Sequence, residues 1–375
     1  MTIRLSHSSV STYNSCSFKW HMHYQRKLRE RVKSAALHFG DCLDKAVNQM
    51  LLDHKNSALK PADLYVANFH GLWTNVKVLK QSGNEELESA ITSNGIAYAE
   101  SDFDKDLLMA EDVTAISNRF ELIDNVEDVL KKYYAINALK KEKGLENLHE
   151  KSVAFLNAVN WYTLKTKGSL ILLEYYRNVI QKIVKVYEIQ KTVSLEDGTG
   201  NTIIGYVDAV LDLGEGPVIC DFKTSSMTYE ASSASNSEQM ALYRHCLRGT
   251  YDTKNVCFIV AYKHIQKVRV KTCSSCGFTA KDGSMHKTCY NENSGRRCGQ
   301  AWNETISLSA KIEMVPGLID ETFENFVVEN FDSVLRGIEH GVFTKNWANC
   351  EAYNRKCAYY YLCRKGSDSK LVQVE

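Results

Sequence analysis

Residues 202–223, TIIGYVDAVLDLGEGPVICDFK, carry the pattern that decides the fold. Two runs rich in Val and Ile stand on either side of Gly214-Glu215-Gly216, and short glycine turns of this kind join antiparallel strands. Another strand is expected over 184–189, before a turn at Asp197-Gly198-Thr199-Gly200. The sequence therefore predicts an antiparallel meander from about 184 to 223.

Charged residues stand where these strands end. Asp221 and Lys223 point to one face, because side chains alternate along a strand, and Asp208 lies on the preceding strand. Two carboxylates can hold a hard divalent cation, and a lysine beside them can orient or help to deprotonate a water. This chemistry suits phosphodiester hydrolysis. The alternative is that Asp208 is a turn residue and that Asp221 and Lys223 form an ordinary surface ion pair.

A helix expected from about 236 to 248 favours the catalytic interpretation. Gln239 and Tyr243 lie four residues apart, on one helical face, directly after the strand, so both can reach the same site. A further strand pair is expected across 255–272. These elements alternate as in an α/β core.

The regions before and after the expected strands have the sequence periodicity of helices. A short helix is expected to continue through Cys16, and an amphipathic helix follows Gly40, with Asp44 beside its apolar stripe. Residues from about 60 to 182 have mostly helical periodicity. Another helix is expected over 321–340, and its proposed buried residues are Phe323, Phe326, Val327, Val334, Leu335 and Ile338.

Five motifs occur in an order that resembles the PD-(D/E)XK nuclease superfamily, and more narrowly the RecB-type domain of recombination, CRISPR-adaptation and phage exonucleases. They are the Ser8–Cys16 segment, Gly40-x3-Asp44, Gly-Tyr-Val-Asp208, Asp221-Phe-Lys223 and Gln239-x3-Tyr243. The resemblance implies a restriction-endonuclease-like core, in which helices flank a mixed central sheet. It also implies a metal-dependent DNA exonuclease acting in recombination, repair or phage DNA metabolism.

The resemblance assigns roles to individual residues. Asp44, Asp208, Asp221 and the Phe222 carbonyl would bind Mg²⁺ or Mn²⁺, and Lys223 would be the catalytic lysine. Gln239 and Tyr243 would position either the DNA backbone or the lysine. Glu188 matches a family glutamate, and Asp44 departs from the pattern because the family commonly has His there.

Two other functions remain open at this stage. The first is a DNA-binding scaffold subunit that keeps the nuclease fold with weak or absent cleavage, and the Asp44 departure supports it. The second is a structure-specific endonuclease.

Composition bears on location and on partners. The 46 Lys and Arg balance 45 Asp and Glu, so any attraction to DNA must come from local patches. No apolar run is long enough to cross a bilayer, and the first residues lack the apolar core of a signal peptide. We expect a cytoplasmic protein that acts on single-stranded DNA or DNA ends, with recombination or replication proteins as partners; the sequence does not predict the oligomeric state.

The chain has 12 cysteines, and their clustering points to metal rather than to disulfides. By resemblance to the iron–sulfur staple of the family, Cys16, Cys350, Cys357 and Cys363 would hold a [4Fe-4S] cluster. Zinc at the same four residues, or buried free thiols, are the alternatives.

A second group, Cys273, Cys276, Cys289 and Cys298, begins with a C-x2-C pair typical of a zinc knuckle. This zinc-ribbon-like insertion would either grip DNA phosphates or serve as a structural staple. We expect five regions: 1–55, N-terminal helices of the nuclease domain; 56–182, a helical insertion; 183–272, the nuclease core; 273–303, the zinc-ribbon-like insertion; 304–375, a C-terminal helix and the iron–sulfur tail.

Overall fold

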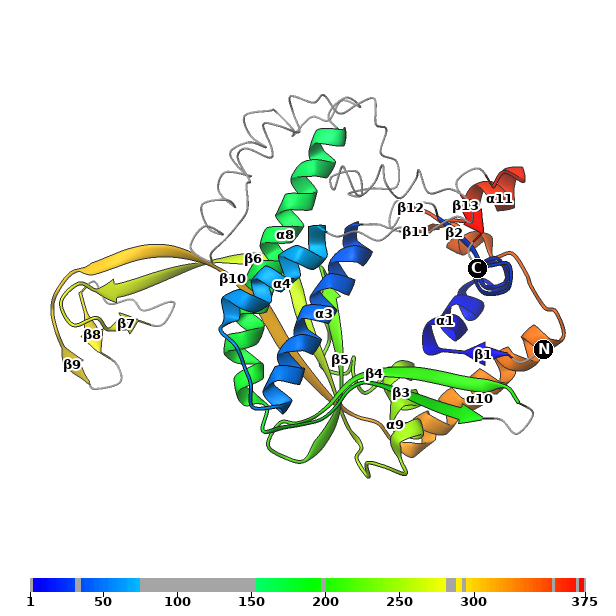
Figure 1. Ribbon diagram of the computed structural model, residues 1–375, viewed down its shortest axis with the longest axis horizontal. Helices are drawn as coiled ribbons and strands as arrows, with labels where there is room; N and C mark the ends of the chain where they lie inside the picture. The colour runs from blue at the N-terminus through cyan, green and yellow to red at the C-terminus, as the bar shows by residue number, and fades with distance from the viewer. Residues whose placement is uncertain are drawn as a thin grey trace.

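A computed structural model describes residues 3–30, 35–74, 153–196, 200–280, 288–291, 295–352, 355–368 and 371–373. Most of the predicted helical insertion, residues 75–152, lies outside these ranges. Within them, the chain forms a seven-stranded mixed sheet with helices on both faces (Figure 1). This architecture confirms the α/β fold class expected from the sequence.

The predicted meander forms one side of the sheet. It consists of β3 (Lys185–Glu196), β4 (Thr202–Asp212) and β5 (Pro217–Ser225), which pair antiparallel in that order. Next to β5 runs β6 (Asn255–Cys273), which is parallel to it, and β10 (Trp302–Leu318) pairs antiparallel with β6. At the other end of β4, the short β1 (Arg4–Leu5) pairs with it in parallel.

Each face of the sheet carries its own apolar cluster. On one face lie α3 (Ala35–Lys55), α4 (Ala62–Thr74) and α8 (Val153–Asn178), whose buried side chains include Met50, Trp73 and Ile171. On the other lie α1 (His7–Ser15), α9 (Glu238–Leu247) and α10 (Glu321–Glu339). The stripe predicted after Gly40 is buried as expected, because α3 turns it toward the sheet.

Three expectations about local structure are wrong. Residues 255–272 form one strand and not a pair, since this stretch contains no glycine or proline to turn the chain. The first helix stops at Cys16, whose backbone is extended (φ −166°, ψ 105°), and the chain continues as α2 (Ser17–Trp20) and a π-helical turn, η1 (His21–Gln25). Phe326 on α10 is 58% exposed; the buried stripe instead includes Phe331.

Two parts of the structure project from the core. The β6–β10 pair extends as a long arm, at whose tip lie β7 (Thr279–Ala280), β8 (Tyr290–Asn291) and β9 (Arg296–Arg297) (Figure 1). The two ends of the chain meet in a small lobe, where β13 (Leu371–Gln373) pairs with β2 (Leu28–Glu30). Also in this lobe are η5 (Trp347–Asn349), β11 (Glu351–Ala352), β12 (Arg355–Lys356) and α11 (Tyr360–Lys365), and Met22 and Tyr359 form its core.

Candidate active site and cysteine centres

An opening in the sheet places the predicted carboxylates together. β3 pairs with one edge of β4, while the other edge pairs with β1 at residues 202–203 and with β5 at residues 209–212. Asp208 lies between these two contacts. Its Oδ2 accepts a hydrogen bond from the Phe222 backbone N–H at 2.8 Å, so the carboxylate spans the gap where β4 and β5 separate.

A chain of polar contacts links β5 to α9. The Lys223 Nζ lies 2.7 Å from Asp221 Oδ2 and donates to Gln239 Oε1 at 2.8 Å. Gln239 Nε2 donates in turn to the Tyr243 hydroxyl at 2.7 Å. The Tyr243 hydroxyl donates to the Tyr206 carbonyl at 2.6 Å, which returns the chain to β4. Residues from the three predicted motifs thus form one connected group.

Gly205 is needed for this arrangement. A Cβ at this position would lie 2.9 Å from the Tyr243 ring. The glycine of the Gly-Tyr-Val-Asp208 motif therefore gives Tyr243 room to lie against β4 and reach the Tyr206 carbonyl.

Asp44 joins the site from α3. It is half-buried, and its Oδ2 accepts a hydrogen bond from Asn48 Nδ2 at 3.0 Å. Burial raises its pKa, and Asp221 contributes to the increase. The neighbouring His38 is buried against Trp73, with Nε2 3.0 Å from the Trp73 carbonyl, so it does not take the place of Asp44.

Burial raises the proton affinity of all three carboxyl groups, and Asp221 adds to the increase at Asp208 and Asp44. Burial and then Asp221 raise the pKa of Asp208 to about 7, although the Phe222 N–H opposes this increase. Burial also raises the pKa of Asp221, against the opposing effect of Lys223. A group of buried acids with one lysine favours a bound cation, and carboxylate and carbonyl oxygens are the ligands that Mg²⁺ and Mn²⁺ prefer.

The sequence analysis matched Glu188 to a family glutamate and did not single out Gln190 or Tyr175, which lie near the carboxylates. Glu188 contacts Lys191 and the Tyr251 hydroxyl, which lies 3.2 Å away. Gln190 instead lies across from Asp208, and the buried Tyr175 of α8 contacts the Phe222 ring edge-on (5.8 Å between centroids). The register of the β3–β4 hairpin could have pointed to Gln190, whereas no sequence signal singles out Tyr175.

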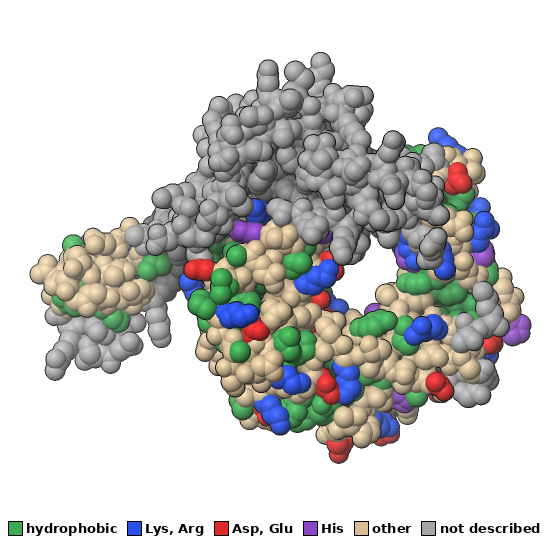
Figure 2. Space-filling model, in the orientation of Figure 1, with side chains coloured by type: hydrophobic (Ala, Val, Ile, Leu, Met, Phe, Trp, Pro, Cys, Tyr) green, Lys and Arg blue, Asp and Glu red, His purple; other side chains and the backbone are tan. Residues whose placement is uncertain are grey.

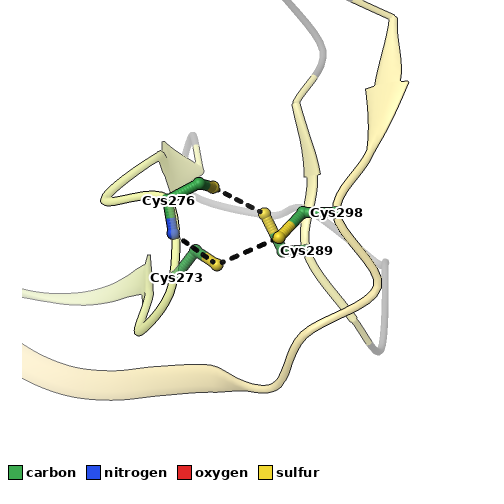
Figure 3. A group of neighbouring side chains, drawn as sticks. All are labelled: Cys273, Cys276, Cys289 and Cys298. Atoms are coloured by element: carbon green, nitrogen blue, oxygen red, sulfur yellow. Dashed lines mark hydrogen bonds between the residues drawn. The ribbon is translucent and has the colours of Figure 1, made fainter.

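The arm tip brings together Cys273, Cys276, Cys289 and Cys298, whose sulfur atoms all lie within 4.8 Å of one another (Figure 3). The Cys273 and Cys298 sulfurs are 3.7 Å apart, and those of Cys276 and Cys289 are 3.6 Å apart. A tetrahedral ion with metal–sulfur bonds of about 2.3 Å separates its ligands by about 3.8 Å. The group therefore has the size of a site for one metal ion.

Backbone groups favour the thiolate form of Cys273 at the tip. Hydrogen bonds from the N–H groups of Cys276 and Ser275 lower the pKa of Cys273 to about 6. On the opposite side, Cys298 N and Gly299 N both donate to the Cys289 carbonyl, at 3.1 Å and 3.0 Å, and fold the second knuckle. The left-handed backbone of Gly277 (φ 71°) and Gly299 (φ 75°) allows both turns.

The four cysteines of the expected iron–sulfur group line a cavity of about 220 Å³ in the lobe that joins the chain ends. Cys16 follows α1, Cys350 and Cys357 flank the β11–β12 hairpin, and Cys363 belongs to α11. Burial and, to a smaller extent, the other three thiols raise the pKa of Cys363 to about 11, against the opposing effect of Lys345. Lys19 and Lys345 also line the cavity, which places positive charge beside any thiolates that form there.

Comparison with known proteins identifies the family. The chain has no significant match among curated proteins. A family model described as the PD-(D/E)XK nuclease superfamily matches residues 4–103 and 121–364. The match includes the opening between β4 and β5, the α9 contacts and Asp44. The chain therefore belongs to the PD-(D/E)XK nuclease superfamily, whose members are metal-dependent nucleases.

Proposed function

We propose that the protein is a DNA exonuclease whose catalytic centre is the group around the β4–β5 opening. The observation that carries this proposal is the continuous chain of contacts from Asp221 through Lys223 and Gln239 to Tyr243. Asp44, Asp208, Asp221 and the Phe222 carbonyl would hold Mg²⁺ or Mn²⁺. When bound, the cation stabilises the negative charge that develops on the phosphate during hydrolysis.

The contacts of Lys223 indicate its part in the reaction. Its ammonium group has three N–H bonds, and the contacts with Asp221 and Gln239 use two of them. The third can contact the attacking water or a phosphate oxygen. Gln239 and Tyr243 then act as positioning residues, because they fix the ammonium group through the Tyr206 carbonyl.

The shape of the molecule is compatible with a nucleic-acid strand. Figure 2 shows a hollow between the side that holds α3 and α8 and the side that holds α1 and α11. Both α3 and β4, which carry Asp44 and Asp208, lie beside it (Figure 1). The described helices include none with the length and apolar character needed to cross a membrane.

An aromatic and basic surface near α11 supports single-stranded DNA as the substrate. Trp347 is 49% exposed, and the Arg364 guanidinium lies 4.9 Å from its ring centre and 5.5 Å from that of Tyr360. Lys356 lies over Tyr360 and Tyr361. Exposed rings stack on bases, and the cations contact phosphates. Tyr359 is buried and is not part of this surface, and Tyr353 lies outside the described residues.

A cleavage assay tests the proposal. End-labelled linear and circular single-stranded DNA would be incubated with Mg²⁺ or Mn²⁺ and wild type, Asp221→Ala or Lys223→Ala. We expect degradation of linear DNA only, and losses of about 10²-fold or more in both variants. Lys185→Ala, an exposed lysine on β3, is the matched control. Cleavage of the circle would identify an endonuclease, and binding without cleavage a DNA-binding scaffold.

For the arm tip, we propose one structural Zn²⁺ bound by the four cysteines. Contacts of 3.6–3.7 Å between sulfur atoms match a single tetrahedral ion, and a donor set of four thiolates is typical of structural zinc. Elemental analysis of the purified protein would then give one zinc per chain, and none would overturn the assignment.

For the lobe at the chain ends, we propose a [4Fe-4S] cluster. The cavity is large enough to separate Cys16, Cys350, Cys357 and Cys363 around a cluster, and all four line it. Anaerobic purification followed by iron and sulfide analysis should give about four of each per chain. Zinc in this lobe, with no iron, would contradict the proposal.

We further propose that the enzyme acts in recombination, repair or phage DNA metabolism, with recombination or replication proteins as partners. This proposal rests on the likeness of the motifs to RecB-type exonucleases. Pull-down of the nuclease from infected and uninfected cells, with Lys223→Ala as a trapping variant, would test it.

A further inference from the structure

Gln190 occupies an unusual position on β3. Ile189 pairs with Ala209 and Lys191 pairs with Val207, so Gln190 lies opposite Asp208 in the register of the hairpin. Opposite residues of an antiparallel pair project to the same face of the sheet. The side chain of Gln190 is therefore brought to the carboxylate site by the strand pairing itself.

The backbone of Gln190 is left-handed, with φ of 48°. A long side chain seldom adopts this conformation, and within a strand it interrupts the regular hydrogen bonding. The register of β3 also shifts nearby, between Val186 and Glu188. Local irregularities of this kind re-aim side chains beside active sites.

The terminal amide reaches two of the carboxylates. Gln190 Nε2 lies 3.4 Å from Asp44 Oδ1 and 3.5 Å from Asp208 Oδ1. It thus connects α3 with β4 across the region where a cation would bind. Because the amide can rotate by half a turn about its last bond, the same position can present Oε1 instead of Nε2.

We propose that Gln190 is a further ligand residue of the catalytic divalent cation, to which its amide oxygen binds beside Asp44 and Asp208. The inference rests on the proposed function. A neutral oxygen adds a ligand without adding charge to a site that already holds three carboxyl groups. In the metal-free protein, the same amide donates its N–H groups to the two carboxylates and keeps them apart.

Mn²⁺ binding by calorimetry tests the proposal without relying on catalysis. Gln190→Met keeps the length of the side chain but removes the oxygen, and we expect its Kd for Mn²⁺ to rise about tenfold. Gln190→Glu keeps an oxygen ligand, and its Kd should equal the wild-type value or fall below it. Thr192→Val, an exposed change two residues along the same strand, should leave Kd unchanged.

Two outcomes would overturn the proposal. Wild-type affinity in Gln190→Met would show that Gln190 takes no part in binding. Equal weakening in Gln190→Met and Gln190→Glu would show that only the N–H groups matter. In either case, wild-type cleavage that depends on Mn²⁺ and on Asp221 leaves the nuclease assignment intact, whereas a wild type that neither binds Mn²⁺ nor cleaves DNA removes both.

Discussion

The carboxylate site and the arm tip are organised in opposite ways. At the carboxylate site, α3, β4, β5 and α9 hold each side chain against an apolar core, and the acids repel one another. At the tip, four cysteines converge on short turns, and the nearby strands β7, β8 and β9 have two residues each. The core thus builds the first site at a cost in stability, whereas the proposed zinc ion would hold the second together.

The largest predicted effect follows from removing one of the cysteines that would bind zinc at the arm tip. Structural zinc contributes about 10–16 kcal/mol to the folding of small zinc domains, so Cys289→Ser should lose its zinc and the order of the tip. Elemental analysis should show zinc falling from one per chain to near zero. Cleavage should stay within about twofold of wild type, because the catalytic residues are held by the core.

Cys246→Ser is the matched control for this variant, since Cys246 belongs to α9 and lies outside both cysteine groups. A loss of zinc in the control, or of most cleavage in Cys289→Ser, would contradict the separation of the two sites.

The carboxylate site should depend on buried contacts between α10 and α9 in the core. Glu324 of α10 is fully buried and contacts three residues of α9 or its end: the Arg244 guanidinium, His245 Nδ1 at 2.8 Å and Arg248 Nη2 at 2.7 Å. These contacts fix the helix that carries Gln239 and Tyr243. Glu324→Ala leaves the buried guanidinium of Arg244 without its carboxylate partner and should cost about 3–5 kcal/mol in urea unfolding, with reduced cleavage.

Glu321→Ala provides the comparison on the same helix. Glu321 is exposed and lies 3.3 Å from Arg248, so its loss should cost about 0–1 kcal/mol. Zinc content should stay at one per chain in both variants. Equal costs for the two glutamates would show that α9 does not depend on the buried contacts.

Because the carboxylate site destabilises the folded state, the free energy of unfolding should depend on pH. The pKa of Asp208 is about 7 in the folded protein and about 4 in an unfolded chain, so the folded state binds the proton more tightly. Without Mg²⁺, stability should therefore fall as pH rises from 4 to 7 and stay low above 7. Asp208→Asn removes this penalty, and should be on the order of 2 kcal/mol more stable at pH 8 but not at pH 4.

Magnesium should reverse the order of stability of the wild type and Asp208→Asn. In thermal unfolding at pH 8 with Mg²⁺, the wild type should be more stable than Asp208→Asn, since only the wild-type carboxylate binds the cation. Omitting Mg²⁺, rather than adding a chelator, keeps the zinc in place. A wild type that is as stable as Asp208→Asn in magnesium-free buffer would argue against strong repulsion among the acids.

The same contrast explains what the sequence could predict. Asp208, Asp221, Lys223, Gln239 and Tyr243 follow strand and helix periodicity, so their convergence could be predicted from alternation and spacing. The cysteine spacing alone left the size of each site open, and only the 3.6–3.7 Å contacts distinguish the tip from the cavity. The arm was missed because the partner of β6 lies beyond the insertion, and a long-range pairing of this kind leaves no local pattern.

The sequence did not single out Tyr175 either, and its substitution gives the smallest predicted effect on stability. Its position on α8 is that of an ordinary core residue, yet its hydroxyl is buried and has no hydrogen-bond partner among the described residues. Asp208 and Asp44 contribute to the rise in its pKa, after burial, so the hydroxyl lies within their electrostatic reach. An unpaired buried hydroxyl costs about 1–3 kcal/mol, and Tyr175→Phe should raise stability by about 1 kcal/mol in magnesium-free buffer. If this hydroxyl serves the cation site, the gain should vanish in Mn²⁺, whereas Tyr176→Phe, its neighbour on α8, should respond equally in both buffers. A gain that persists in Mn²⁺ would make Tyr175 a packing residue only and would confine the cost of the carboxylate site to its three acids.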